Sequence, residues 1–153
     1  MSILKQLISK RVYLTTYQIG LLVARTHRTL KAHTDEVLAP YDLTSVDWAI
    51  MGLVHDDNGS GIRLSDLSIE LGVEAPFITV RIKRLEKRQL VLITQSTHDK
   101  RERLVTSTPA GIKIVATIEP ILRTQSRRWL TGANLLDIKG FITTMKTIVK
   151  NSD

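Results

Sequence analysis

The sequence predicts a mainly α-helical fold with a small β wing, an α+β chain that forms one domain over residues 1–153. Three observations predict it. Apolar residues recur at intervals of three and four over most of the chain, as helices require. Two short runs with β-branched residues lie on either side of a polar loop, between residues 90 and 106. The segments before and after this region carry apolar stripes without a central core of their own. The order of elements predicts a winged helix-turn-helix flanked by N- and C-terminal dimerisation helices.

The first predicted element is a long helix over residues 12–39. Its apolar stripe includes Ile19, Val23 and Leu30 and repeats every three or four residues, as in a coiled coil. The helix offers more apolar surface than one small winged domain can cover, which predicts a partner chain. Pro40 is expected to stop it.

A second helix should begin after Thr44, whose side chain can cap it, with Asp47 three residues later as a capping-box partner. The polar, glycine-containing segment 56–61 is a predicted loop. Residues 62–64 are expected to add a short third strand against the wing.

The next two helices form the predicted helix-turn-helix. Ser65 is the expected N-cap of the first, because a serine hydroxyl can accept a hydrogen bond from a free backbone N–H of the first turn. Gly72 follows at its end, where a residue that tolerates positive φ is favoured. The second helix is expected over residues 75–89, with Pro76 in its first turn.

This second helix is predicted to be apolar on one face and basic on the other. An α-helix fits the DNA major groove, and lysine and arginine can reach both phosphates and guanine edges. At 100° per residue, the inner face carries Ile78, Ile82 and Leu85, and the outer face carries Pro76, Phe77, Val80, Lys83, Arg84 and Lys87, with Thr79 and Arg81 on its flanks.

The predicted wing is a hairpin of strands 90–94 and 103–106 around the polar loop 95–102. Residues 79–103 contain eight lysines and arginines against three acidic residues, a net charge of +5 out of +7 for the chain. A charge run alone is usually a solvated surface. Combined with the helix-turn-helix spacing and the hairpin, it favours DNA binding.

These motifs resemble the MarR family of bacterial transcriptional regulators over residues 15–150. Three groups of residues carry the resemblance. They are the segment Leu38-Ala39-Pro40-Tyr41-Asp42-Leu43-Thr44 with Trp48, the segments Leu64-Ser65-Asp66-Leu67 and Leu71-Gly72-Val73, and the wing motif Asp99-Lys100-Arg101 with Leu104-Val105, Thr108 and Gly111. It implies that Arg101 enters the minor groove and that Asp99 orients it.

Two positions depart from the family pattern. Thr79 is followed by Val80 where the family often has arginine, so Val80 is expected to contact a thymine methyl group and polar reading to come from Thr79, Arg81 and Arg84. Gln89 stands where the family usually has glycine. A left-handed turn there would be strained, so the helix is expected to end differently.

The predicted DNA-binding set joins the helix-turn-helix to the wing. Lys83 and Lys87 are expected to contact phosphates. The full set is Ser65, Pro76, Phe77, Thr79, Val80, Arg81, Lys83, Arg84, Lys87, His98, Asp99, Lys100, Arg101 and Arg103. A small-molecule pocket formed by Tyr17, Tyr41, Trp48 and Met51 is a weaker hypothesis, because such residues more often form plain core.

After the wing, Thr108 and Pro109 should open a helix that Pro120 kinks or interrupts, and a break at 131–134 should precede the last helix. We expect residues 44–106 to form the DNA-binding region, and residues 12–39 and 108–150 to supply the dimerisation helices. A two-fold dimer would present two recognition helices to successive major grooves.

Composition narrows the remaining function classes. The chain has no cysteine, which excludes disulfides, cysteine-based zinc sites and thiol redox sensing. No secretory signal and no run of ~18 apolar residues is visible, so a cytoplasmic protein without a membrane span is expected. The four histidines do not form a metal-binding spacing, and no catalytic motif or cofactor loop is present, so neither an enzyme nor a cofactor is predicted.

The sequence therefore predicts a homodimeric regulator that binds a pseudo-palindromic operator in double-stranded DNA. Repression is the expected mode, and release by a small-molecule effector is left open. The alternative is a winged helix used as a protein-interaction module without specific DNA binding. The operator, the effector and the regulated genes are not specified by the sequence.

Overall fold

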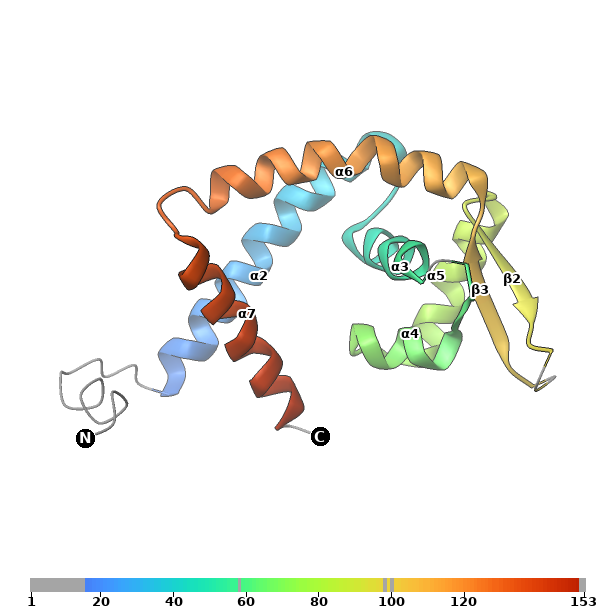
Figure 1. Cartoon of the computed structure of the whole chain (residues 1–153), viewed down its shortest axis with the longest axis horizontal. Helices are drawn as coiled ribbons and strands as arrows, with labels where there is room; N and C mark the ends of the chain where they lie inside the picture. Colours follow the sequence, from blue (N-terminus) through green and yellow to red (C-terminus); the bar gives the residue numbers. More distant parts are fainter. Residues whose placement is uncertain (1–15, 58, 98, 100, 152–153) are drawn as a thin grey trace. The chain divides into compact units, whose positions relative to one another are not determined.

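The structure, a computed structural model, describes residues 16–57, 59–97, 99 and 101–151. The chain forms two compact units, residues 1–115 and 116–153, and each is considered by itself. Figure 1 shows the order of the elements along the chain. Among the described residues, the helices are α2 (Thr16–Leu38), α3 (Ser45–Asp56), α4 (Leu64–Leu71), α5 (Ala75–Lys87), α6 (Pro109–Trp129) and α7 (Leu135–Lys150), with a 3-10 turn η1 (Ala39–Tyr41) and the strands β1 (Ile62–Arg63), β2 (Val91–Gln95) and β3 (Arg103–Ser107).

The three strands form one antiparallel sheet in the order β1-β3-β2. Ile93 faces Val105 across β2 and β3, and Ile62 of β1 pairs with the same Val105 from the other side. The sequence-based prediction of a hairpin wing with a short third strand is confirmed.

The core of residues 1–115 lies where α3, α4 and α5 meet the sheet. Ile78, Ile82 and Leu85 are fully buried, so the predicted inner face of α5 is confirmed. The other buried apolar side chains of this unit are Leu38, Leu43, Ile50, Met51, Val54, Leu67, Leu90, Val91, Val105 and Val115.

The start of α3 follows the capping pattern in the sequence. The Thr44 hydroxyl accepts from the Asp47 N–H at 3.3 Å, and the Asp47 carboxylate accepts from the Thr44 N–H at 2.9 Å, which completes the capping box. In contrast, the prediction that Ser65 caps α4 is wrong. Helix α4 already begins at Leu64, directly after β1, and its N-cap is Arg63, which makes no side-chain cap.

The connection after α5 differs from the expectation for Gln89. Gln89 adopts the left-handed conformation with φ 57°, despite having a side chain. The turn is held by hydrogen bonds from the Leu90 N–H to the Leu85 carbonyl at 3.0 Å and from the Thr108 hydroxyl to the Gln89 carbonyl at 2.6 Å. These bonds offset the strain, so the helix ends in the left-handed turn that the sequence was expected to avoid.

Gly111 explains how α6 passes so close to this turn. A Cβ at this position would lie 2.0 Å from the Leu90 carbonyl oxygen, a distance that no side chain can accept. The Gly111 N–H also donates to the Thr108 hydroxyl oxygen at 3.0 Å, a side-chain cap at the start of α6. Pro120 does not interrupt α6, which is continuous from Pro109 to Trp129.

The expected N-terminal helix, residues 12–39, is described from Thr16 and ends at Leu38, and residues 12–15 lie outside the described part. Pro40 follows in η1, consistent with its predicted role in stopping the helix. The break at residues 131–134 is confirmed, because Asn134 caps α7 through a second capping box with Asp137.

Candidate nucleic-acid interface

Besides its buried side, helix α5 has an outward surface, a surface that faces α3 and η1, and a side that faces the wing. Phe77 and Val80 near its N-terminus are 45% and 66% exposed, and Lys83 and Lys87 on later turns are also exposed. Among the residues that the structure describes, neither lysine has an ion-pair or hydrogen-bond partner. The outward surface of α5 is therefore apolar near its start and positively charged further along.

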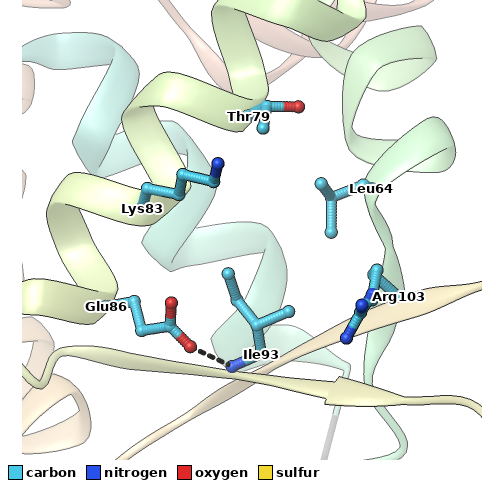
Figure 2. A pocket seen from close by; sticks show the side chains of 6 residues that line it. All are labelled: Leu64, Thr79, Lys83, Glu86, Ile93 and Arg103. Atoms are coloured by element: carbon cyan, nitrogen blue, oxygen red, sulfur yellow. Dashed lines mark hydrogen bonds between the residues drawn. The ribbon is translucent and has the colours of Figure 1, made fainter.

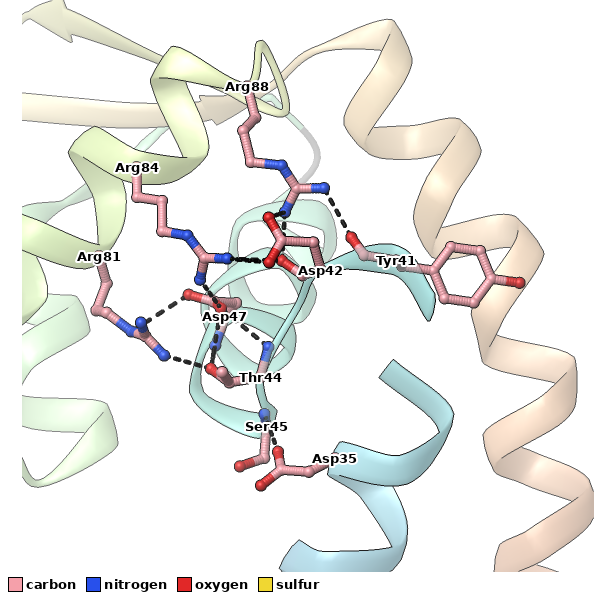
Figure 3. A network of polar contacts seen from close by, with 9 residues as sticks. All are labelled: Asp35, Tyr41, Asp42, Thr44, Ser45, Asp47, Arg81, Arg84 and Arg88. Carbon is pink, nitrogen blue, oxygen red and sulfur yellow. Dashed lines mark hydrogen bonds and ion pairs between the residues drawn. The ribbon is translucent and has the colours of Figure 1, made fainter. Parts of the chain in front are cut away.

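A second surface of α5 carries three arginines that point toward α3 and η1. Arg81, Arg84 and Arg88 follow one another at three- and four-residue spacing, which places them along one side of the helix. Figure 3 shows their guanidinium groups converging on Asp47 at the start of α3 and on Asp42 beside it.

The centre of this cluster is the carboxylate of Asp47, which is fully buried. Its Oδ2 accepts from Arg84 Nη1 at 3.2 Å and from the backbone N–H and hydroxyl of Thr44, each at 2.9 Å. Its Oδ1 lies 3.3 Å from Arg81 Nε, without the alignment of a hydrogen bond. A second Arg81 nitrogen donates to the Thr44 hydroxyl. A buried carboxylate requires such compensation, because burial without partners is strongly unfavourable.

The other arginines bind the turn before α3. Arg84 Nη2 lies 2.6 Å from the carboxylate of Asp42, and Arg88 donates to the backbone carbonyls of Asp42 at 2.6 Å and Tyr41 at 2.7 Å. Asp42 has φ 53°, a conformation in which its carbonyl can meet both guanidinium groups. The turn between α2 and α3 is thereby tied to α5.

These contacts change the placement of one predicted DNA-binding residue. The sequence predicted Arg84 on the outward face of α5, which is wrong, because its side chain points toward α3 and pairs with Asp42 and Asp47. Arg81 lies on a flank as expected, and that flank faces Thr44 and Asp47. The helical wheel treated Arg84 as outward because it counts angles from Cα positions and ignores the reach of a long side chain toward a buried charge.

Sequence reasoning did not identify the Asp42, Asp47 and Arg88 contacts. The sequence pattern predicts only a capping role for Asp47, although an acidic residue among apolar neighbours on a buried helix side needs a cation nearby. The arginine spacing on α5 was the signal that could have located that cation.

The same turn is tied to α2 through Asp35. Its carboxylate accepts from the Ser45 N–H at 2.6 Å and pairs with Lys31. Burial acts to raise the pKa of Asp35, but the hydrogen bonds from Lys31 and Ser45 and the Lys31 charge outweigh it and lower the pKa below its ordinary value.

The wing contributes a second charged surface. The carboxylate of Asp99 accepts from the Arg101 backbone N–H at 2.8 Å, a local turn that fixes the backbone from which the Arg101 side chain extends. Arg101 and Arg103 are exposed, whereas Arg63 of β1 pairs with Glu102 at 3.3 Å. His98 and Lys100, also in the predicted DNA-binding set, lie outside the described residues.

A pocket of about 400 Å³ lies between α5 and the sheet. Figure 2 shows Thr79 and Lys83 from α5 and Arg103 from β3 around it, and the Glu86 carboxylate accepts from the Ile93 N–H at 3.2 Å at its floor. Leu64 completes the lining. Thr79 is thus directed to the wing side of α5, where its hydroxyl donates to the Ala75 carbonyl at 2.9 Å.

The four residues of the hypothesised ligand pocket do not line this cavity. Met51 is buried in the core, Tyr41 and Trp48 are half-buried, and Tyr17 on α2 is 69% exposed.

Ser65 is exposed on α4, where its hydroxyl donates to Asp66 at 3.3 Å. Within the described part of the chain, no three histidine, aspartate or glutamate side chains are grouped for a metal ion, and no helix is long and apolar enough to cross a membrane.

Comparison with known proteins identifies the region that contains α5 and the wing. The model of the MarR family matches residues 43–102, from just before α3 to the end of the wing loop. Residues 43–102 form a MarR family domain. The predicted family resemblance is thereby confirmed. A comparison with curated protein sequences finds no significant match.

Solved structures, one of them of a MarR family transcriptional regulator, have the same fold over most of this chain. AbsC, a MarR family transcriptional regulator from Streptomyces coelicolor, is 21% identical with a TM-score of 0.78, and the match covers 92% of this chain and 97% of AbsC. CouR from Rhodococcus jostii RHA1 bound to p-coumaroyl-CoA is 19% identical with a TM-score of 0.78, covering 86% and 91%. MepR from S. aureus in complex with DNA is 18% identical with a TM-score of 0.76, covering 91% and 99%. These matches confirm the predicted mainly α fold with a small β wing.

Proposed function

We propose that this chain is a homodimeric transcriptional regulator that binds specific sequences in double-stranded DNA. The observation that carries the proposal is the outward surface of α5, which offers Val80, Lys83 and Lys87 to solvent while the opposite side of the helix is buried. A helix with one buried and one basic side can enter the major groove. DNA in the solved complex of MepR supports this use of the fold.

The free cations on two elements support phosphate binding. Lys83 and Lys87 on α5 and Arg101 and Arg103 on the wing have no ion pair with any described residue. Neutralising phosphates with such side chains releases counterions, so affinity should fall steeply as salt rises. We propose that Arg101, whose backbone is fixed by Asp99, reaches the minor groove beside the groove that α5 enters.

The dimer is supported by α7, which has no buried residue among its sixteen. Its exposed apolar side chains include Leu136 at 79%, Phe141 at 56% and Val149 at 66%. An amphipathic helix of this length is marginal in water unless its apolar side is covered. Considered separately, α2 also exposes Tyr17, Leu21 and Leu22. We propose that residues 12–39 and 108–150 form the interface with a second copy.

Sedimentation velocity tests this interface. The full chain should sediment as a dimer at micromolar concentration, and Phe141→Glu should shift it toward monomer because a charge would then be buried in the interface. Glu in place of Lys139, an exposed polar position on the same helix, is the matched control and should leave the dimer intact. A well-folded monomer of the unmodified chain would contradict the proposal.

We further propose that the dimer represses transcription, by occupying its site, and that a small molecule can release it. The CouR structure with p-coumaroyl-CoA supports a ligand for this fold. The ligand of this chain is not specified by that likeness, since the two sequences are 19% identical.

The test of the proposed function is titration of fluorescent duplexes from the region upstream of the chain's own gene. One fragment should bind at nanomolar to tens of nanomolar concentration in the presence of excess random duplex. Binding that random duplex competes away entirely would instead favour an interaction module without specific DNA recognition.

A further inference from the structure

The recognition helix has an unusual division of labour between its arginines and its apolar residues. Arginine is the commonest reader of guanine, because its guanidinium can bond both guanine acceptors. All three arginines of α5 and its C-cap, however, are committed to groups of α3 and η1, and their side chains are only 20% to 35% exposed.

Releasing these arginines toward DNA would leave other groups unpaired. If Arg81 and Arg84 turned outward, the Asp47 carboxylate would lose both of its cations while remaining buried. Removing one partner of a buried ion pair is strongly unfavourable. The arginines are therefore better suited to fix the helix than to read bases.

In the N-terminal part of α5, the Thr79 hydroxyl donates to the Ala75 carbonyl on the wing side, and the residues around it have apolar side chains. Phe77 and Val80, about one turn apart, are the large apolar residues exposed there, and the N-terminal residues of a recognition helix are those that approach base edges. The Arg81 guanidinium lies over one face of the Phe77 ring at 5.7 Å from its centroid, and Phe77 is nevertheless 45% exposed. Lys83, exposed one turn further along α5, also lines the pocket of Figure 2.

From this arrangement, and on the basis of the proposed function, we infer that Phe77 and Val80 select the binding site by contact with thymine C5-methyl groups. The methyl group is the apolar feature of the major groove, and phenylalanine and small aliphatic groups pack against it. Sequence preference in each half-site then depends on methyl-bearing pyrimidines rather than on arginine–guanine pairs, and the lysines supply sequence-independent affinity.

The experiment replaces single thymines by uracils, which removes one methyl group and leaves base pairing unchanged. The best duplex from a randomised library is synthesised with uracil at each thymine in turn, and affinities for the full chain are measured at fixed salt. One or two positions per half-site should show about fourfold weaker binding, the value of one buried methyl group. Replacing cytosine by 5-methylcytosine in a duplex with a T·A-to-C·G change at those positions should recover part of the loss.

Variants assign the contacts to side chains. Val80→Ala and Phe77→Ala should each remove the preference for thymine over uracil at one position, with the other position unaffected. Ile69→Ala is the matched control, because Ile69 is exposed at 77% on α4 and lies outside α5. The control should keep both preferences.

Two results would overturn the inference, and they are distinguishable. Specific binding that tolerates uracil at every position would refute the methyl reading while leaving the proposed function standing. A loss of preference for a guanine in Arg81→Ala or Arg84→Ala would do the same. Selection of no sequence at all from the library would overturn the proposed function and the inference together.

Discussion

Replacing Asp47 by alanine should destabilise the MarR domain far more than the loss of an ordinary helix cap. The Asp47 carboxylate completes the capping box of α3 and is also the buried anion that pairs with Arg81 and Arg84. Loss of a cap costs about 1 kcal/mol. Breaking a buried ion pair costs about 3–5 kcal/mol. Because the two arginine side chains are 20% and 35% exposed, water can replace part of their lost pairing. We therefore expect a total loss below the sum of these two terms, about 2–4 kcal/mol.

The chain contains its own control for the capping part of this loss. Asp137 holds the same position in the capping box of α7, where its carboxylate accepts from the Asn134 N–H at 3.0 Å, but it is exposed and has no arginine partner among the described residues. Asp137→Ala should cost about 0.5–1 kcal/mol.

Urea unfolding at one fixed protein concentration measures both values, because the stability of a dimer depends on concentration. Double-mutant cycles of Asp47→Asn with Arg84→Met and with Arg81→Met would measure each pairwise coupling. Equal losses in Asp47→Ala and Asp137→Ala, or no coupling in either cycle, would refute the assignment of Asp47 as a buried counter-ion.

Four further outcomes follow from other contacts. Arg101→Ala should weaken DNA binding by roughly 1–3 kcal/mol at fixed salt, more at sites with a narrow A·T-rich minor groove, and unchanged affinity would contradict the wing contact. Lys87→Ala should weaken binding to all duplexes alike and reduce the slope of log affinity against log salt by about one per half-site, which a salt titration measures. Gly111→Ala should unfold or displace the start of α6, because the new methyl would meet the Leu90 carbonyl, and a melting temperature equal to that of the parent would exclude this clash. Asp35→Asn should be less stable than the parent at neutral pH, because folding lowers the pKa of Asp35. The difference in unfolding free energy should be present above pH 3.8, the ordinary pKa of this carboxyl, and should disappear as the pH falls through the lower folded pKa. Urea unfolding at several pH values measures this difference.

The sequence was informative wherever local chemistry decides the structure. The capping box at Thr44, the buried face at Ile78 and Ile82, and the hairpin pattern were each predicted because their signals lie within one or two turns of the chain. Gln89 shows the limit of such reasoning. Its strained turn is held by Thr108, nineteen residues away, and no local rule contains that bond.

The candidate site was predicted less well for the same reason. The side chains on α5 were assigned from a helical wheel, which places Cα atoms correctly but cannot identify a buried partner on another element. Arg84 was therefore assigned to DNA, although its partners are Asp42 and Asp47, about forty residues earlier in the chain. Val80 and the two lysines have no such partner, and for them the wheel predicted an exposure that the structure confirms.

Selection of duplexes from a fully randomised library by the purified chain tests the central claim most directly. We predict enrichment of a two-fold symmetric sequence with half-sites about 10 base pairs apart, and loss of tight binding when five base pairs are inserted between them. Recovery of random sequences, or enrichment of a single half-site that tolerates the insertion, would contradict a dimeric, sequence-specific DNA-binding regulator.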